Sequence, residues 1–506
     1  MTPGPEEETE APPAGRGGDR AVDVVNGRLF RPMVVLAAPI VAAQVLQVGY
    51  NLADTFWVGR LGGDPVAALS YSWAIVFLMV SVGGGLTVAG TVLVAQHKGA
   101  RDFAETDHVA GQTLSFVTIV AALFALIGIV VTPYLLQLVG ATPGTPPFEM
   151  AVGYTRIIFT GVLFMFWFFI FDALSRGWGD TRTPLYLMAI SVAINVLLDP
   201  ILILGFEGNP LFAWVGLEAL QADLLSATGF AGLGVEGAAL ATILSRGVAA
   251  AVGLYLLFTG GVGLQPALAD LRPELETVRT IVDIGGPIAV EQGMRATGLA
   301  VLTAVIALAG DDAVAAYGIV NRLSSLMFLP ALGLSRGIET VVGQNLGARQ
   351  VDRAKRAVYQ ASALLVGVFV VVIAAAYLNA EAIVGVFVRT DAGGTVPVDE
   401  VVEIGALYIW IAGPSYVFLG VFQVLLGAIR GSGSTRAAML LSIQELWVWR
   451  LPLSVVLLAV VGLGIVGVWY AVAVSFVASA VITAVWFHRG TWTDSIVGHP
   501  EVRPAD

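Results

Sequence analysis

The chain has 506 residues, of which 57% are hydrophobic and 12% are charged, and its mean hydropathy is +0.84. A water-soluble protein of this length could not keep so much apolar surface from solvent, so the composition indicates an integral membrane protein. The formal net charge is −11 with no basic tract that would favour nucleic acid, and the lack of cysteine excludes disulfides and thiolate metal sites.

The N-terminal residues differ from the rest of the chain. They are rich in Pro, Gly and Glu and cannot bury enough apolar surface to fold, so residues 1–28 are predicted to be a disordered tail rather than a signal peptide. Beyond them, twelve apolar runs are long enough to cross about 30 Å of hydrocarbon, which predicts an all-α protein with 12 transmembrane helices. The runs fall at roughly 31–59, 66–96, 107–136, 149–176, 183–206, 231–258, 279–309, 313–345, 354–378, 400–429, 436–461 and 463–487.

Basic residues cluster at alternate ends of these predicted spans. They precede the first span and follow the second, fourth, sixth, eighth, tenth and twelfth, whereas the other loops are mainly acidic. The positive-inside rule therefore predicts a multi-pass protein of the plasma membrane with both termini in the cytoplasm. The basic residues at these ends include Arg28, Arg31, Lys98, Arg101, Arg176, Arg182, Arg272, Arg279, Arg349, Arg353, Lys355, Arg356, Arg430, Arg436, His488 and Arg489.

The sequence is duplicated. Each half has six spans and returns the chain to the same side, so the two halves should form pseudo-symmetric six-helix lobes about an axis along the membrane normal. The predicted division is a first lobe at 29–258, a cytoplasmic connection at 259–278, a second lobe at 279–489 and a cytoplasmic tail at 490–506. Extra residues near 206–231 lengthen an outer loop of the first lobe. Repeated positions are Pro39 and Pro287, Asp64 and Asp312, Gln96 and Gln344, Arg101 and Arg349, Arg176 and Arg430, and Gly237 and Gly467.

The first span contains a proline, an amide and a carboxylate. Pro39 removes a backbone hydrogen bond and is expected to bend the helix. Gln47 and Asp54 are seven residues apart and so lie on about the same helical face. Asp54 is either an acid solvated at the outer end of the helix or a ligand for a coupling ion. The matching position of the second half is Leu302.

The fifth span contains the strongest signal for a site. Asn195 and Asp199 are four residues apart and share a helical face, and Pro200 weakens the helix beside them. A carboxylate inside the membrane is costly unless it is protonated, paired or bound to a cation, so such a residue is functional by default. The alternative is that Asp199 only caps or hydrogen-bonds a neighbouring helix. Its matching position in the second half is Leu451.

Other acids of the spans have bases close to them in sequence. Asp172 precedes Arg176 by one helical turn, which predicts an ordinary ion pair, whereas Asp54 and Asp199 have no base within a turn. A paired charge costs less to bury and has less reason to titrate. The second-half acids either pair in the same way or contact substrate, and the expected pairs are Glu291 with Arg295, Glu339 with Arg336, and Glu445 with Arg450.

Taken together, the motifs resemble those of multidrug and toxic compound extrusion (MATE) transporters, most closely the archaeal and DinF-like branch. The resemblance extends over everything except the tails and implies the MATE fold. It also implies an antiporter, not an enzyme, that exchanges H+ or Na+ for amphipathic, often cationic drugs and needs no cofactor. The motifs are Pro39-Ile, Tyr50-Asn-Leu-x-Asp54-x-x-Trp-x-Gly59, Arg176-Gly-x-Gly-Asp-Thr-Arg182, Asn195-x-x-x-Asp199-Pro and Gly234-x-x-Gly-Ala-Ala-Leu-Ala-Thr242.

The resemblance also implies roles for single residues. Thr242 by itself would be a packing residue, and the family often has Asn where this chain has Asp172, which therefore either titrates or only pairs with Arg176. The implied partners are drug-like small molecules and the lipid bilayer, with the protein as a monomer. The implied cation ligands are Asp54, Asn195, Asp199 and Thr242, with Gln47, Tyr50 and Asp172 in support and Pro39 as the bend of the first helix.

Two other functions remain open. A flippase for lipid-linked precursors belongs to the same wider superfamily, but it would need a strongly cationic cavity for pyrophosphate. A membrane scaffold or receptor would not need isolated acids in its spans. No Walker motif is present, so ATP is not the expected energy source.

Overall fold

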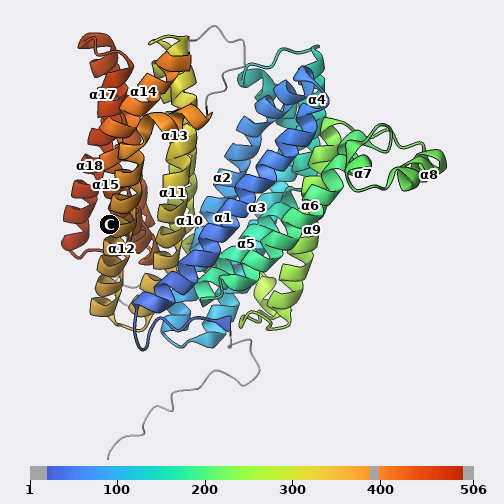
Figure 1. Cartoon of the computed structure of the whole chain (residues 1–506). Helices are drawn as coiled ribbons and strands as arrows, with labels where there is room; N and C mark the ends of the chain where they lie inside the picture. Colours follow the sequence, from blue (N-terminus) through green and yellow to red (C-terminus); the bar gives the residue numbers. More distant parts are fainter. Residues whose placement is uncertain (1–19, 388–397, 494–506) are drawn as a thin grey trace, which may run out of the picture.

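The computed structural model describes residues 20–387 and 398–493, and within these ranges it consists of helices and connections, with no strand (Figure 1). This confirms the all-α fold class. The helices of the first half form one group and those of the second half form another beside it. The first-half helices are α1 (Phe30–Gly59), α2 (Gly63–Gly99), α3 (Phe103–Leu138), α4 (Pro146–Thr160), α5 (Val162–Trp178), α6 (Arg182–Leu204), α7 (Pro210–Trp214), α8 (Glu218–Thr228) and α9 (Val235–Phe258).

The second half repeats this order, including the place where one span is broken. α4 and α5 meet at Gly161 with a bend of 51°, and the corresponding break in the second half lies at Gly413–Ser415, between α14 and α15. The second-half helices are α10 (Leu275–Ala307), α11 (Asp311–Gly347), α12 (Val351–Leu378), α13 (Ala380–Phe387), α14 (Val398–Ile411), α15 (Tyr416–Gly431), α16 (Thr435–Gln444), η4 (Glu445–Arg450), α17 (Leu451–Val455), η5 (Val456–Val460) and α18 (Ile465–His488).

Eleven of the predicted spans are long and apolar enough to cross a membrane. Ten are helices or runs of helices such as Thr435–Val460, and the bent pair α4–α5 makes the eleventh, among the described residues. The remaining predicted span, α10, has 33 residues but carries Glu291 and Arg295 in its middle, which lowers its hydropathy. The total of twelve spans therefore stays a prediction, although all twelve segments are helical.

The two apolar cores do not divide where the two halves of the sequence divide. The first turns of α1, with Met33 and Leu36, belong to the core built mainly by the second half. The first turns of α10, with Ile281 and Ile284, belong to the core of the first half. Each half thus inserts the start of its leading helix into the other half, which ties the two groups together near the predicted cytoplasmic ends.

Two glycines allow α2 and α11 to cross closely. A Cβ on Gly99 would lie 2.0 Å from the carbonyl oxygen of Gln344, and a Cβ on Gly347 would lie 2.0 Å from that of Gln96. The 248-residue repeat relates Gly99 to Gly347 and Gln96 to Gln344, so it exchanges the two contacts and the pseudo-twofold axis passes through this crossing. The duplication read from the sequence is therefore also a symmetry of the packing.

The same two glutamines join the halves by hydrogen bonds. Gln96 Nε2 donates to the carbonyl oxygen of Gly431 at 3.2 Å, and Gln344 Nε2 donates to that of Gly177 at 2.9 Å. All these groups are buried, so the bonds are shielded from water. They close the interface at the end of the molecule where α2 and α11 finish.

Residues 20–28 lie across both halves at that same end. Val22 N donates to the carbonyl oxygen of Gly179 in the first half, at 3.1 Å, and Val24, only 1% exposed, accepts from Arg353 Nε in the second half at 3.2 Å. These residues belong to the stretch predicted to be a disordered tail, so the prediction is wrong for them. Residues 1–19 lie outside the described part of the chain.

The remaining differences lie in the connections. The extra residues at 206–231 contain α7 and α8, which project from the side of the first half (Figure 1). α10 begins at Leu275, inside the predicted 259–278 connection. That connection is fixed to α3 by Gln112, whose side chain donates to the carbonyl oxygen of Asp270 at 2.9 Å and accepts from Glu274 N at 2.8 Å.

Candidate cation site

Three helices of the first half supply the predicted site: α1, α6 and α9. α6 and α9 approach closely because Gly237 has no side chain, and a Cβ there would lie 2.2 Å from the carbonyl oxygen of Leu202. Leu233 N, just before α9, donates to that same carbonyl oxygen at 2.8 Å. Near the end of α6, the carbonyl oxygen of Pro200 accepts from Asn209 Nδ2 at 2.7 Å. The repeated glycine motif therefore fixes the two helices that carry Asp199 and Thr242.

The predicted acids and amide lie together and are buried. Asp54 of α1 is 7% exposed, and Asn195 and Asp199 of α6 are both fully buried. Asn195 Nδ2 donates to Asp199 Oδ1 at 3.1 Å, and the carboxylate of Asp54 lies close enough to both residues to interact with them. Asp54 is thus a buried member of the group, which excludes its interpretation as an acid solvated at a helix end.

Tyr50 and Thr242 join α1 to α9 beside this group. Their hydroxyl oxygens are 2.5 Å apart, and both side chains are buried. Tyr154 of α4 is also buried, and it lies close enough to Asp54 and Asp199 to interact with them electrostatically. Thr242, which by itself would be a packing residue, therefore has a polar partner one helical turn before Asp54.

Arg246 of α9 is the residue that the sequence analysis missed. It is 3% exposed, its Nη2 donates to Gln47 Oε1, and its charge lies near Asp54. Its guanidinium carbon also lies 5.4 Å from the ring centroid of Tyr50 and 5.0 Å from that of Phe168. Asp54 and Asp199 have no base close in sequence, but the fold supplies one from another helix. A single arginine in an otherwise apolar span was the available signal.

Three oxygens in this group have no hydrogen-bond partner among the described residues: Asp54 Oδ1, Asn195 Oδ1 and Asp199 Oδ2. A buried oxygen without a partner is costly, and three together indicate that a proton or a cation satisfies them. With both acids ionised and Arg246 charged, the group carries one net negative charge. A single monovalent cation would neutralise it.

Pro39 lies several turns before Asp54 along α1, and Asp172 of α5 approaches the group only through its electrostatic interaction with Arg246. Asp172 pairs with Arg176 on the next turn of α5, as predicted. The pair lies near Arg336 on the second half, so it belongs to the boundary between the halves. α1 runs as one uninterrupted helix through Pro39.

The arrangement can be compared with known proteins. A match to the MatE family covers residues 39–201 and again 287–456, one copy in each half. The chain belongs to the MATE family. Members of this family are transporters embedded in membranes, not enzymes, so both points of the sequence analysis are confirmed.

Curated relatives support the assignment over nearly the whole chain. A probable multidrug resistance protein of Bacillus subtilis, YoeA, is 27% identical over 90% of this chain and 92% of its own length. The probable multidrug resistance protein NorM of Thermotoga maritima is 26% identical over 91% and 93%. A FAD transporter of Shewanella oneidensis is 25% identical over 85% and 88%.

Solved MATE structures share the fold. An outward-facing multidrug resistance MATE transporter superposes with a TM-score of 0.81 at 22% identity, over 93% of this chain and 98% of the other. A transporter from Pyrococcus furiosus, described as having a binding pocket of reverse polarity, gives the same values. At this identity the likeness establishes the MATE fold alone.

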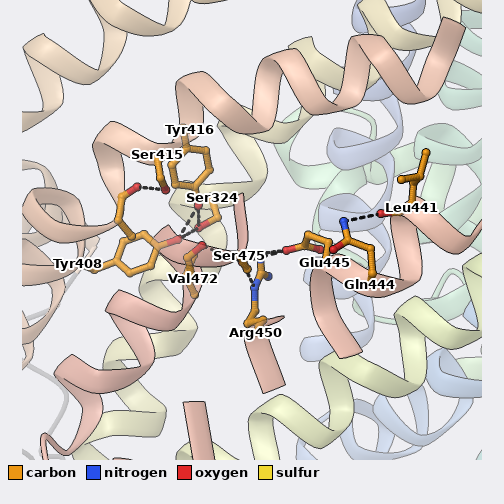
Figure 2. A network of polar contacts seen from close by, with 11 residues as sticks. Ser324, Tyr408, Ser415, Tyr416, Leu441, Gln444, Glu445, Arg450, Val472 and Ser475 are labelled. Atoms are coloured by element: carbon orange, nitrogen blue, oxygen red, sulfur yellow. Dashed lines mark hydrogen bonds and ion pairs between the residues drawn. The ribbon is translucent and has the colours of Figure 1, made fainter. Parts of the chain in front are cut away.

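The second half of this MATE protein has its own polar network (Figure 2). Glu445 accepts from Arg450 Nη2 and from Ser475 Oγ, and the Glu445–Arg450 pair is as predicted. Tyr408 and Tyr416 join their hydroxyl groups at 2.6 Å beside it. The network lies where η4, a π-helical turn, interrupts the α-helical pattern.

The other two second-half pairs were predicted with the wrong partners. Glu291 pairs with Arg430 of α15 rather than with Arg295 on its own helix. The ion pair of Glu339 is also with Arg430, at 3.8 Å, rather than with Arg336. α15 packs against α11, and its long Arg430 side chain reaches acids on both α10 and α11, which neighbours in sequence do not reveal.

Proposed function

We propose that the protein is a cation-coupled efflux antiporter that exports amphipathic drug-like compounds by alternating access, with Asp54, Asn195, Asp199 and Thr242 holding the coupling ion. The observation that carries the proposal is the set of three buried oxygens without partners, contributed by two helices. A purely structural cluster would satisfy these oxygens with protein donors. Multidrug resistance names among relatives that cover nine-tenths of the chain support export of drugs.

The charge of the group favours a monovalent ion. Two carboxylates opposite Arg246 leave one negative charge, which one H+ or one Na+ balances, and a divalent ion would leave an excess positive charge inside the membrane. A proton would attach to a carboxylate of Asp54 or Asp199. Sodium would use their oxygens together with those of Asn195 and Thr242.

Ion binding would change the position of α1 relative to α6, because one carboxylate of the site, Asp54, belongs to α1 and the other, Asp199, belongs to α6. A cation shared by the two carboxylates draws the outer half of α1 toward α6, and Pro39 is the weak point about which that half can tilt. Solved MATE structures with TM-scores of 0.80 are described as straight and as bent, so a conformational change of this kind has a precedent within the fold. The drug would leave as the first-half cavity narrows, and rocking of the lobes would then release the ion inside.

The same proposal covers topology. The protein would lie in the plasma membrane as a monomer with both termini in the cytoplasm, where residues 20–28 and the α2–α11 crossing close the interface. The flippase alternative is less favoured, because the first-half group is net negative and Arg430 and Arg450 are paired with acids.

The test is drug efflux from proteoliposomes with separately imposed gradients of Na+ and H+. Ethidium loaded inside should leave faster with the gradient of the coupling ion and show no response to the other gradient. Asp199→Asn should abolish the gradient-driven component, because an amide cannot carry the proton or the charge. The matched control is Asp223→Asn on the exposed α8, which removes a carboxylate elsewhere and should retain full transport. Undiminished gradient-driven efflux by folded Asp199→Asn protein would refute the proposal.

A further inference from the structure

Arg295, in the middle of α10, is a half-buried cation that pairs with no acid or carbonyl group of the described residues. Its guanidinium carbon lies 4.7 Å from the ring centroid of Phe328 on α11. Among the described residues, it makes no side-chain hydrogen bond and no ion pair, although Glu291 lies one helical turn before it. An arginine within a membrane span normally pairs with an acid or a carbonyl group, so a guanidinium left available here is expected to be functional.

The charges around Arg295 do not balance. Among the acids, Glu445 has the largest electrostatic interaction with Arg295. Its carboxylate, however, already accepts hydrogen bonds from Arg450 and Ser475. The next charges, Glu291 and Arg430, pair with each other and cancel. The guanidinium groups of Arg295 and Arg450 therefore share the single carboxylate of Glu445, and this part of the second half carries one net positive charge.

The internal repeat shows that this charge has been rearranged between the halves. Arg295 occupies the position of Gln47, and Phe476 occupies the position of Arg246. In the first half the arginine on α9 has Gln47 as a partner and carboxylates nearby. In the second half the arginine is on α10, and the positions of the two acids are taken by buried Leu302 and Leu451. The second half retains the cation and lacks the acids that balance it.

Arg336 provides a contrast on the neighbouring helix. It also makes no side-chain hydrogen bond or ion pair among the described residues. It lies, however, within a balanced cluster of three acids and three bases, so no charge is left over for a ligand. The cluster members are Asp172, Glu291, Glu339, Arg176, Arg336 and Arg430.

Two aromatic side chains lie near the Arg295 guanidinium. Phe328 lies beneath it, and Trp447 reaches the same stretch of α10, where its Nε1 donates to the carbonyl oxygen of Met294 at 3.0 Å. A ligand that fits would combine one acidic group with an aromatic or aliphatic body. Its single charge would balance the excess positive charge.

We propose that Arg295 binds the acidic group of an amphipathic organic anion, a carboxylate, sulfonate or phosphate monoanion, whose apolar part packs against Phe328 and Trp447. The acidic group can come from a dissolved compound or from a lipid headgroup, since the chemistry is the same. This inference rests on the proposed export function in one respect: it adds anions to the compounds that the protein handles. The first half would then select the coupling cation and the second half would accept the anion.

The test is equilibrium binding to the full chain in phosphatidylcholine nanodiscs, with no ion gradient. The probes are 1-anilinonaphthalene-8-sulfonate and N-phenyl-1-naphthylamine, which share one aromatic skeleton and differ by the sulfonate. Saturable energy transfer from tryptophan, corrected for empty nanodiscs, reports binding. Arg295→Gln, which introduces the first-half residue, should weaken binding of the sulfonate about tenfold and leave the neutral probe unchanged. Arg295→Lys, which keeps the charge, should lose less.

Arg322→Gln is the matched control, because it removes an exposed arginine from the neighbouring α11. It should bind both probes as the unaltered protein does. The proposal is overturned if Arg295→Gln binds the sulfonate normally, if it loses both probes equally, or if Arg322→Gln loses as much of the sulfonate. Normal binding of the neutral probe also shows that the altered protein is folded.

A second set of nanodiscs distinguishes the two sources of the acidic group. Adding phosphatidylglycerol should weaken sulfonate binding more in the unaltered protein than in Arg295→Gln if a lipid headgroup occupies the site. An equal effect in both proteins assigns the site to a dissolved anion. Because no gradient is present, a failure of ion-coupled efflux leaves this result unaffected, and the two proposals can fail separately.

Discussion

Arg246 determines how the two buried acids of the first half behave. Asp54 and Asp199 look unpaired along the chain, yet the guanidinium from α9 lies near Asp54 and is held there by Gln47 and two aromatic rings. It offsets one of the two negative charges and leaves a demand for one cation. A second base would remove that demand, and no base would make two ionised carboxylates too costly to bury.

Replacing Arg246 should therefore weaken coupling to the ion gradient. In Arg246→Gln the two carboxylates lose the positive charge that offsets one of them, so a single monovalent cation no longer neutralises the group. Gradient-driven ethidium efflux from proteoliposomes should fall strongly. Arg246→Lys keeps the charge and should retain more of this efflux, and undiminished gradient-driven efflux by folded Arg246→Gln protein would contradict this role.

At the scale of the helices, close approach of backbones sets the geometry. The α2–α11 crossing depends on Gly99 and Gly347, because each is in contact with a carbonyl oxygen of the other helix. The α6–α9 contact depends in the same way on Gly237. Small residues at such crossings are typical of membrane helices, where van der Waals packing drives association.

Gly99→Ala should destabilise the protein by about 1–3 kcal/mol, because the added Cβ would lie 2.0 Å from a backbone oxygen that cannot rotate away. Gly367→Ala on the exposed face of α12 is the control, since a Cβ there meets nothing within 4 Å and should be neutral or slightly stabilising. Thermal unfolding in detergent measures both. Equal stability of the two variants would show that the crossing can relax at no cost.

At the scale of the whole molecule, the two halves are tied at one end. Three sets of contacts lie at this end: the hydrogen bonds from Gln96 and Gln344, the first turns of α1 and α10 that pack in the opposite half, and the contacts of residues 20–28. Alternating access requires these contacts to break during each cycle. The halves are therefore expected to transport only while this end can open.

A disulfide across the tied end should stop the cycle. Ala37 of α1 and Gly337 of α11 would place their Cβ atoms 3.5 Å apart, which a disulfide can span. The chain has no cysteine of its own, so the pair Ala37→Cys and Gly337→Cys would be the only thiols. Oxidation should abolish efflux and reduction should restore it, while each single variant stays active under both conditions. Full efflux from the oxidised pair would mean that this contact does not move.

Much of the fold could be predicted from the sequence because a bilayer allows few kinds of backbone structure. Runs of apolar residues must be helices, since only helices satisfy the backbone within a segment, and repeated positions such as Gln96 and Gln344 predicted the symmetry. The acids and amide of α1 and α6 were found because an isolated polar group in an apolar run is expensive. Residues 20–28 were misjudged because their order comes from partners far along the chain, such as Gly179 and Arg353.

The sequence by itself determined the membrane environment, the duplication and the all-α architecture, and it singled out Asp54, Asn195 and Asp199 as isolated polar residues of the spans. Only the tertiary structure decided which charges meet. It placed Arg246 near Asp54, paired Glu291 with Arg430, and left Arg295 over the ring of Phe328 with no acid of the described residues paired to it. The physical reason is that hydropathy and repeats are properties of a segment, whereas charge pairing inside a membrane depends on helix faces that are set only when all the helices pack.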